Sequence, residues 1–162
     1  MAFDVAGSIP AGATVNRVTL TLNMSRTVAD VQDIELRRLL ADWGEGASAS
    51  GGNEGSGIAA AAGDATWVHT IFDTEEWEIL GGDFSSQAAA TQQVGGVGQY
   101  TWASTEEMVA NVQSWLEDPS TNFGWLLLGN EAATRTTKRF DSRENGTEAK
   151  RPVLTVEYTS RE

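Results

Sequence analysis

The clearest pattern in the chain is an alternation of apolar and polar residues between Val15 and Met24. Successive side chains of a β-strand point to opposite faces, so this alternation predicts a strand with one buried face. A weaker version begins at Asp33, where Arg37 and Arg38 interrupt it. Both stretches are expected to belong to a sheet that has one apolar side.

Four more stretches have the composition of strands: Thr66–Phe72, Phe123–Leu128, Lys138–Ser142 and Pro152–Tyr158. Asn145 and Gly146 lie between the last two and both tolerate positive φ, which predicts a tight hairpin at that point. The closing segment from Phe140 to Tyr158 is therefore expected to finish a sheet.

One helix is expected, at about 104–117. Ser104-Thr105-Glu106-Glu107 has the form of a capping box, in which Ser104 and Glu107 satisfy each other's backbone amides. Apolar residues then recur at helical spacing until Asp118-Pro119 ends the pattern. They are Met108, Val109, Val112, Trp115 and Leu116.

The remaining stretches are rich in glycine. Residues from Gly44 to Gly63 offer no apolar face and predict a long loop, and Gly81–Phe84 with the Ser, Gln and Ala that follow predicts a second irregular segment. Gly95–Gly98 predicts a turn. Together these patterns favour an all-β, two-sheet jelly-roll sandwich with long Gly-rich loops, built as a single domain over 1–162.

Composition and net charge limit the classes of partner that the chain is expected to bind. The 162 residues hold 11 Lys plus Arg against 23 Asp plus Glu, a formal net charge of -12. Such a surface repels nucleic acid and anionic lipid, so neither is an expected partner. No run approaches the ~20 apolar residues of a membrane helix, and the sequence after Met1 is unlike a signal peptide. The chain is thus either cytoplasmic or exported by a signal outside this sequence.

An ordered set of motifs extends over nearly the whole chain. It comprises Phe3-Asp4, Ile9-Pro10-Ala11-Gly12-Ala13, Gly63-Asp64-Ala65-Thr66-Trp67, Gly81-Gly82-Asp83-Phe84, Val112-Gln113-Ser114-Trp115, Asn122-Phe123-Gly124-Trp125, Phe140-Asp141-Ser142-Arg143-Glu144 and Arg151-Pro152-Val153-Leu154. In order and spacing this set resembles the DNRLRE domain family of bacterial and archaeal extracellular β-sandwich modules.

The resemblance implies a module of a larger secreted or cell-surface protein, with carbohydrate binding in some relatives and no catalytic residues. One departure is that such domains usually carry additional strand sequence before the Phe3-Asp4 position. We therefore expect a domain that lacks its usual N-terminal strand region, or whose sheet edge another chain completes.

The sequence offers few residues that could carry out catalysis. The chain has no cysteine and one histidine, His69, without a nucleophile motif beside it, so we expect no enzyme. Carboxylates such as Asp64, Asp73, Asp83 and Glu144 would have to pair as a glycosidase acid and nucleophile. No cofactor is required, although Asp64 and Asp83 beside Gly-rich loops are the expected ligands of a structural Ca²⁺ ion.

Aromatic residues are the better candidates for ligand contact, because an aromatic face stacks on a sugar ring. Trp115 and Trp125 fall in apolar patterns and are expected in the core. The candidates are Tyr100 and four tryptophans in or beside predicted loops, Trp43, Trp67, Trp77 and Trp102; for these four, burial is an equally open alternative. Arg139 would add a bidentate contact to an acidic polysaccharide, or pair with the chain's own carboxylates.

The leading hypothesis is therefore a non-catalytic binding or adhesion module that recognises extracellular polysaccharide. The alternative is a structural unit of a surface layer or fibre, in which strand edges and Gly-rich loops meet neighbouring copies. A polysaccharide-degrading enzyme is the least favoured class, because its acid and base would be drawn from unremarkable carboxylates.

Overall fold

The computed structural model describes residues 1–48 and 58–161, so part of the predicted loop from Gly44 to Gly63 lies outside the described residues. The chain divides into two compact units. The first, here called the sandwich unit, consists of Met1–Arg38 and Ser86–Glu162. The second, the insert unit, is Leu39–Ser85.

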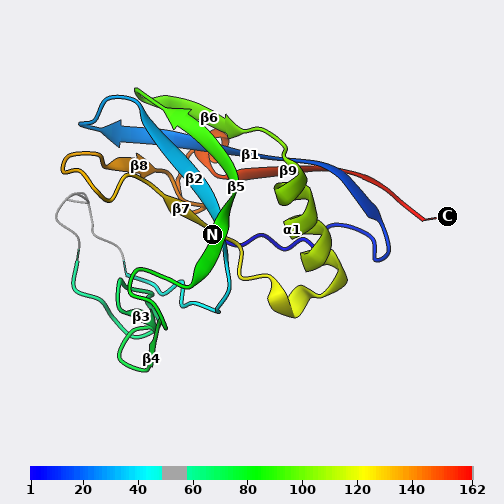
Figure 1. Cartoon of the computed structure of the whole chain (residues 1–162), viewed down its shortest axis with the longest axis horizontal. Helices are drawn as coiled ribbons and strands as arrows, with labels where there is room; N and C mark the ends of the chain where they lie inside the picture. The colour runs from blue at the N-terminus through cyan, green and yellow to red at the C-terminus, as the bar shows by residue number, and fades with distance from the viewer. Residues whose placement is uncertain (49–57, 162) are drawn as a thin grey trace. The chain divides into compact units, whose positions relative to one another are not determined.

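The elements follow one another as β1 (Thr14–Thr27), β2 (Gln32–Leu39), β3 (His69–Ile71), β4 (Glu75–Glu76), β5 (Phe84–Val94), β6 (Gly98–Trp102), α1 (Glu106–Glu117), the 3-10 helix η1 (Pro119–Thr121), β7 (Trp125–Leu128), β8 (Lys138–Phe140), the 3-10 helix η2 (Glu148–Lys150) and β9 (Val153–Thr159) (Figure 1). The ribbon β3–β4 belongs to the insert unit, as do the last residue of β2 and the first two residues of β5; the other elements belong to the sandwich unit.

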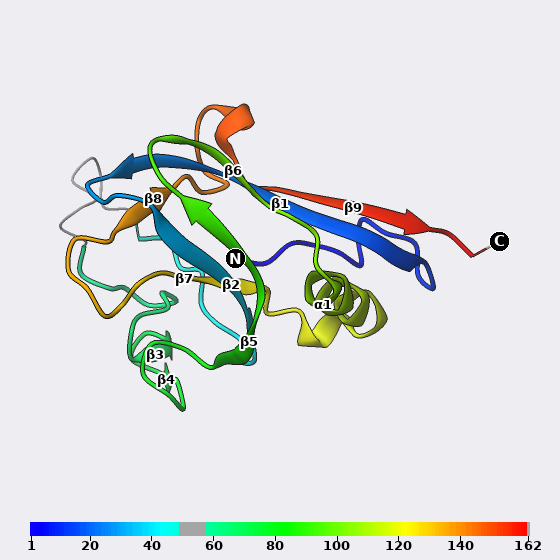
Figure 2. The same ribbon diagram turned by 45° about the horizontal axis from the view of Figure 1, so that its top comes forward.

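The first sheet is organised around β1, which is hydrogen-bonded along both edges. One edge pairs with β6, from Leu20 opposite Trp102 to Met24 opposite Gly98. The other edge pairs first with β9 and then with β8, where Met24 lies opposite Phe140. Figure 2 shows β8 and β9 end to end beside β1.

The hairpin predicted at Asn145-Gly146 is wrong. Since β8 and β9 occupy successive stretches of the same edge of β1, they do not pair with each other. The chain between them turns at Ser142–Asn145 through an Asn145 amide to Ser142 carbonyl bond and then forms η2. Neither Asn145 nor Gly146 takes positive φ.

The second sheet has the order β5-β2-β7, with Glu35 opposite Leu128 and Arg38 opposite Trp125. β5 corrects the irregular segment predicted after Phe84. Its Ser, Gln and Ala residues are poor strand formers, but β2 supplies a partner and Ala89 and Ala90 fit into the core.

The core lies between the two sheets and α1. The inward residues of β1, from Val18 to Met24, are at most 1% exposed, and those of β2 are Ile34 and Leu36. Successive strands change sheet at β1–β2, β5–β6 and β7–β8, as is typical of jelly-roll connections. The predicted all-β sandwich with one helix is confirmed.

Helix α1 starts one residue later than its capping box predicted. Thr105 is the N-cap, since its hydroxyl accepts the amide of Met108. The Ser104 hydroxyl instead accepts the amide of Val18 in β1. Gln113 also fastens the helix to this strand, with its Oε1 accepting the Val15 amide at 2.8 Å. No helix in the described residues is long and apolar enough to cross a bilayer.

A buried aromatic pair joins α1 to β7, as predicted for Trp115 and Trp125. Their ring centroids are 4.6 Å apart in an edge-on arrangement, and both side chains are fully buried. The Trp125 indole donates to Asn111 Oδ1 at 2.9 Å, and the Asn111 amide donates to Glu107. Asn111 is thus a buried polar residue whose partners are supplied by both elements.

Lys138, in β8, connects its strand to the β1–β2 and β5–β6 turns of the sandwich unit. Its ammonium donates to the carbonyls of Ala29, Asp30 and Gly95 at 2.8 to 3.0 Å. Burial lowers the pKa of Lys138, and the negative charge of Asp30 opposes that shift.

The N-terminal segment is held against β7. Met1 and Trp125 exchange two backbone hydrogen bonds, of 2.7 and 2.9 Å. At Gly124 φ is +77°, and an added Cβ would lie 1.9 Å from the Met1 carbonyl oxygen. Only glycine fits this close approach.

Replacing Gly124 with Ala is therefore expected to lower the free energy of unfolding by about 1–3 kcal/mol, measured by urea denaturation. The matched control is Gly146→Ala, because nothing lies within 4 Å of a Cβ there. A loss at Gly146 equal to that at Gly124 would contradict the steric explanation.

Asn111→Ala is expected to cost about 1–3 kcal/mol, since it leaves the buried Trp125 indole N–H without an acceptor. The same change in a Trp125→Phe background removes that penalty, so the two losses should not add. Additive losses in thermal or urea unfolding would show that the hydrogen bond contributes nothing.

Candidate binding site

Asp64 connects several segments of the insert unit. Asp64 is 8% exposed and accepts the Ala61 amide at 2.8 Å and the Ser48 hydroxyl at 2.6 Å. Its carbonyl accepts the amide of Phe72, and it forms an isolated bridge with Glu45. Asp64 thereby ties the start of the insert to the β3 region.

These hydrogen bonds set the acidity of Asp64. The Ala61 amide first, and then the Ser48 hydroxyl, lower the pKa of the carboxyl below its ordinary 3.8, because both stabilise the ionised form. Burial opposes this shift but is outweighed.

Asp83, the other predicted calcium ligand, has different partners. Its two oxygens accept the amides of Ile79 and Glu78 and so close the turn that follows β4. Within 1–48 and 58–161, no three acidic or histidine side chains gather as a metal site would require. Calcium stays a prediction from the sequence, and both carboxylates have structural roles that the sequence did not indicate.

Trp67 is the predicted aromatic residue with the most open side chain, 60% exposed. Its backbone is nevertheless fixed, because its carbonyl accepts the Gly81 amide at 2.8 Å. Its ring lies against Gly81, where an added Cβ would be 2.8 Å from the indole. The Thr66 hydroxyl accepts the amides of Val68 and His69 and fixes the same turn.

Three exposed aliphatic residues come from the same two segments as Trp67 and Gly81. Val68, Ile79 and Leu80 are 36%, 69% and 63% exposed. We call these three residues together with Trp67 the Trp67 surface. Exposed apolar groups gathered in a small unit are typical of a binding surface.

The charge of the insert unit has one sign. The sequence contains no Lys or Arg from Leu39 to Thr134. Glu75 and Glu76 form β4 and are exposed, as is Glu78. Within the insert the sequence has nine acidic residues: Asp42, Glu45, Glu54, Asp64, Asp73, Glu75, Glu76, Glu78 and Asp83.

The other predicted aromatic residues are less open. Trp77 is 9% exposed, and its indole donates to the Thr66 carbonyl. Trp102 is fully buried, with its indole bonded to the Ile34 carbonyl, so neither ring offers a face to a ligand. The Tyr100 hydroxyl donates to Gly96 and accepts from Gly95, which closes the β5–β6 turn. Trp43 is half-buried.

Arg139 is also half-buried, and its Nε donates to the Ser25 hydroxyl at 3.1 Å. Burial of the Asp141 carboxyl raises its pKa, but hydrogen bonds from Ser25 and Asn23, and then the charges of Lys150 and Arg139, outweigh burial and lower the pKa of Asp141. Arg139 thus has a hydrogen-bond partner within the protein, and its contact to an acidic polysaccharide stays a prediction.

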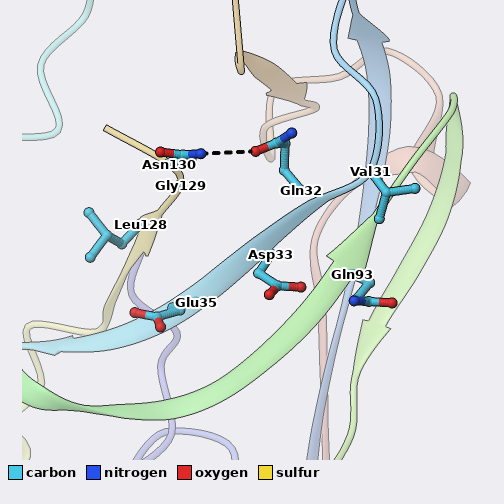
Figure 3. Close-up of a pocket in the computed structure, with 8 residues that line it drawn as sticks. All are labelled: Val31, Gln32, Asp33, Glu35, Gln93, Leu128, Gly129 and Asn130. Carbon is cyan, nitrogen blue, oxygen red and sulfur yellow. Dashed lines mark hydrogen bonds between the residues drawn. The ribbon is translucent and has the colours of Figure 1, made fainter. Parts of the chain in front are cut away.

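A second candidate surface is a pocket of about 440 Å³ on the second sheet, which the sequence did not indicate (Figure 3). Of its acids, Glu35 accepts from the Arg37 guanidinium, whereas Asp33 is exposed. The Asn130 amide reaches toward Gln32. Its lining is made of amides, carboxylates and aliphatic groups, mainly Gln32, Asp33, Glu35, Gln93, Leu128 and Asn130.

No model of a known protein family, no curated protein and no solved structure matches this chain. The DNRLRE resemblance therefore stays a prediction that depends on the ordered motifs.

Acid is expected to loosen the insert unit through Asp64. Because the folded-state pKa is lowered, the unfolded chain takes up its proton first as pH falls. The contribution of Asp64 is thus complete above about pH 4 and is lost as pH falls through the lowered value. Hydrogen exchange at the Ala61 and Phe72 amides should accelerate in this range.

Asp64→Asn should remove that acid dependence and raise exchange at neutral pH. Asp141→Asn is the control in the sandwich unit and should leave the insert amides unchanged. An unaltered pH profile in Asp64→Asn would contradict this role.

Proposed function

We propose that the chain is a non-catalytic module that binds extracellular polysaccharide, with Trp67 as the stacking surface for a sugar ring. The observation that carries this proposal is an indole 60% exposed on a backbone that Thr66 and Gly81 hold fixed. Exposing a large aromatic side chain to water is energetically unfavourable. An exposed aromatic side chain on a hydrogen-bonded backbone therefore favours a binding role.

Preorganisation strengthens this argument. Trp has only two side-chain torsions, and the Trp67 ring already rests on Gly81. Little conformational freedom is then lost when a ligand stacks on it. Ile79 and Leu80 would extend the apolar contact to the C–H faces of neighbouring sugar units.

The contacts of the titratable groups support binding rather than catalysis. His69 shares a 3.0 Å hydrogen bond with the Thr66 hydroxyl and lies edge-on to Phe72, so it is used within its own turn. In the pocket, the Arg37 guanidinium donates to Glu35, so this carboxylate already has a partner within the protein. We further propose that the module works outside the cell, within a larger secreted or surface protein.

Charge separation favours assembly of neighbouring copies as a second candidate. The segment from Arg135 to Arg151 holds six basic residues, whereas the insert unit holds none. An acidic insert meeting this basic segment of another copy would form a head-to-tail contact. The basic residues are Arg135, Lys138, Arg139, Arg143, Lys150 and Arg151.

Trp67→Ala is expected to weaken retention on a polysaccharide affinity gel at least about tenfold, whereas Trp67→Phe keeps most of it. Val97→Ala is the control, since Val97 is 69% exposed in the sandwich unit. Retention that survives Trp67→Ala would reject the stacking surface.

Light scattering over a range of concentrations separates the second candidate from the first. Polysaccharide binding predicts a particle of constant mass, and head-to-tail assembly predicts growth that salt reverses. Growth together with absent retention would favour assembly.

A further inference from the structure

We infer that the polysaccharide bound at the Trp67 surface carries free amino groups, as a polymer of de-acetylated amino sugars does. This inference rests on the proposed function and adds the chemical class of the ligand. It depends on the charge around Trp67, which the stacking argument did not use.

The nearest charged side chains along the chain are carboxylates. Cα pairing sets His69 opposite Glu76, and the next backbone bond runs from the Trp77 amide to the Val68 carbonyl. Trp77 thus pairs with Val68, which follows Trp67 in the chain. Glu76 and Glu78 are the residues on either side of Trp77. Both carboxylates are exposed, as is Glu75.

No basic side chain of the insert unit compensates the negative charge of these glutamates. The insert has no Lys or Arg, so no ammonium or guanidinium group of its own neutralises these carboxylates. A polysaccharide bearing carboxylates or sulfates would be repelled at this surface. A protonated amine would gain a charge-assisted hydrogen bond to an exposed glutamate while its ring stacks on Trp67.

The distribution of charge favours a repeating polymer over a basic peptide. Exposed carboxylates occur at Asp73, Glu75, Glu76 and Glu78, and within the described residues no three acidic or histidine side chains gather as a metal site would require. A polymer with an amine on every unit can meet such a series. β3 and β4 span only three and two residues, so the ribbon offers a peptide little edge for backbone pairing.

The test compares glucosamine oligomers with the same oligomers after N-acetylation, titrated calorimetrically into the full chain at mildly acidic pH. The amine form should bind at least about tenfold more tightly. Raising NaCl from about 0.05 to about 0.5 M should remove most of that preference, because screening shortens the range of charge interactions.

Variants locate the effect. Replacing Glu75, Glu76 and Glu78 together with Gln should abolish the preference for the amine form yet keep weak binding of both forms. The control replaces Glu106, Glu131 and Glu148, which are exposed in the sandwich unit, and changes the net charge equally. It should leave the preference intact.

The outcomes separate the two proposals. Equal binding of both oligomers, lost in Trp67→Ala, would overturn the amine inference and support the stacking surface. If the amine form still binds the Trp67→Ala variant, both proposals are overturned, because the acidic residues would then attract any cation without stacking. Polylysine that binds as tightly, and needs Trp67, would overturn the glycan ligand in favour of a basic protein segment.

Discussion

The sandwich depends on one constraint, the pairing of β1 along both of its edges. Three strands from the second half of the chain, β6, β8 and β9, find their partner in this one strand. The pairing also fixes which face of β1 is buried, because a slip of one residue would turn its whole apolar row outward. The helix depends on the same strand, since Gln113 and Ser104 both bond to its backbone.

Local patterns predicted the elements whose side chains follow a regular period. The alternation in β1 and the helical stripe of α1 are visible without a partner, and so is the burial of Trp115 and Trp125. β5 was not predictable in this way, because its residues become a strand only where β2 offers hydrogen bonds. The hairpin failed for a related reason: turn chemistry is local, but the pairing of β8 and β9 is decided by β1.

The candidate site shows the same division. Trp67 and Trp77 looked alike in the sequence, and one is open while the other is buried. The difference arises from the fold of the insert, where the Trp77 indole donates to the Thr66 carbonyl and the Trp67 ring rests on Gly81. The pocket escaped notice because its polar residues belong to separate strands. The net negative charge of the chain could be counted from the sequence. That one unit contains acidic residues and no Lys or Arg became clear only when the structure defined the boundaries of that unit.

The distribution of basic residues has a practical consequence for handling this protein. Both lysines, Lys138 and Lys150, lie in the sandwich unit, so amine-coupling reagents that react at lysine side chains would attach there. Lys138 is held by three carbonyls, which leaves the exposed Lys150 as the more reactive of the two. A chip or fluorophore joined at that position would leave the insert unit chemically untouched. Proteases that cut after Lys or Arg likewise find no site from Leu39 to Thr134, so complete digestion of the unfolded chain would leave this stretch in one peptide.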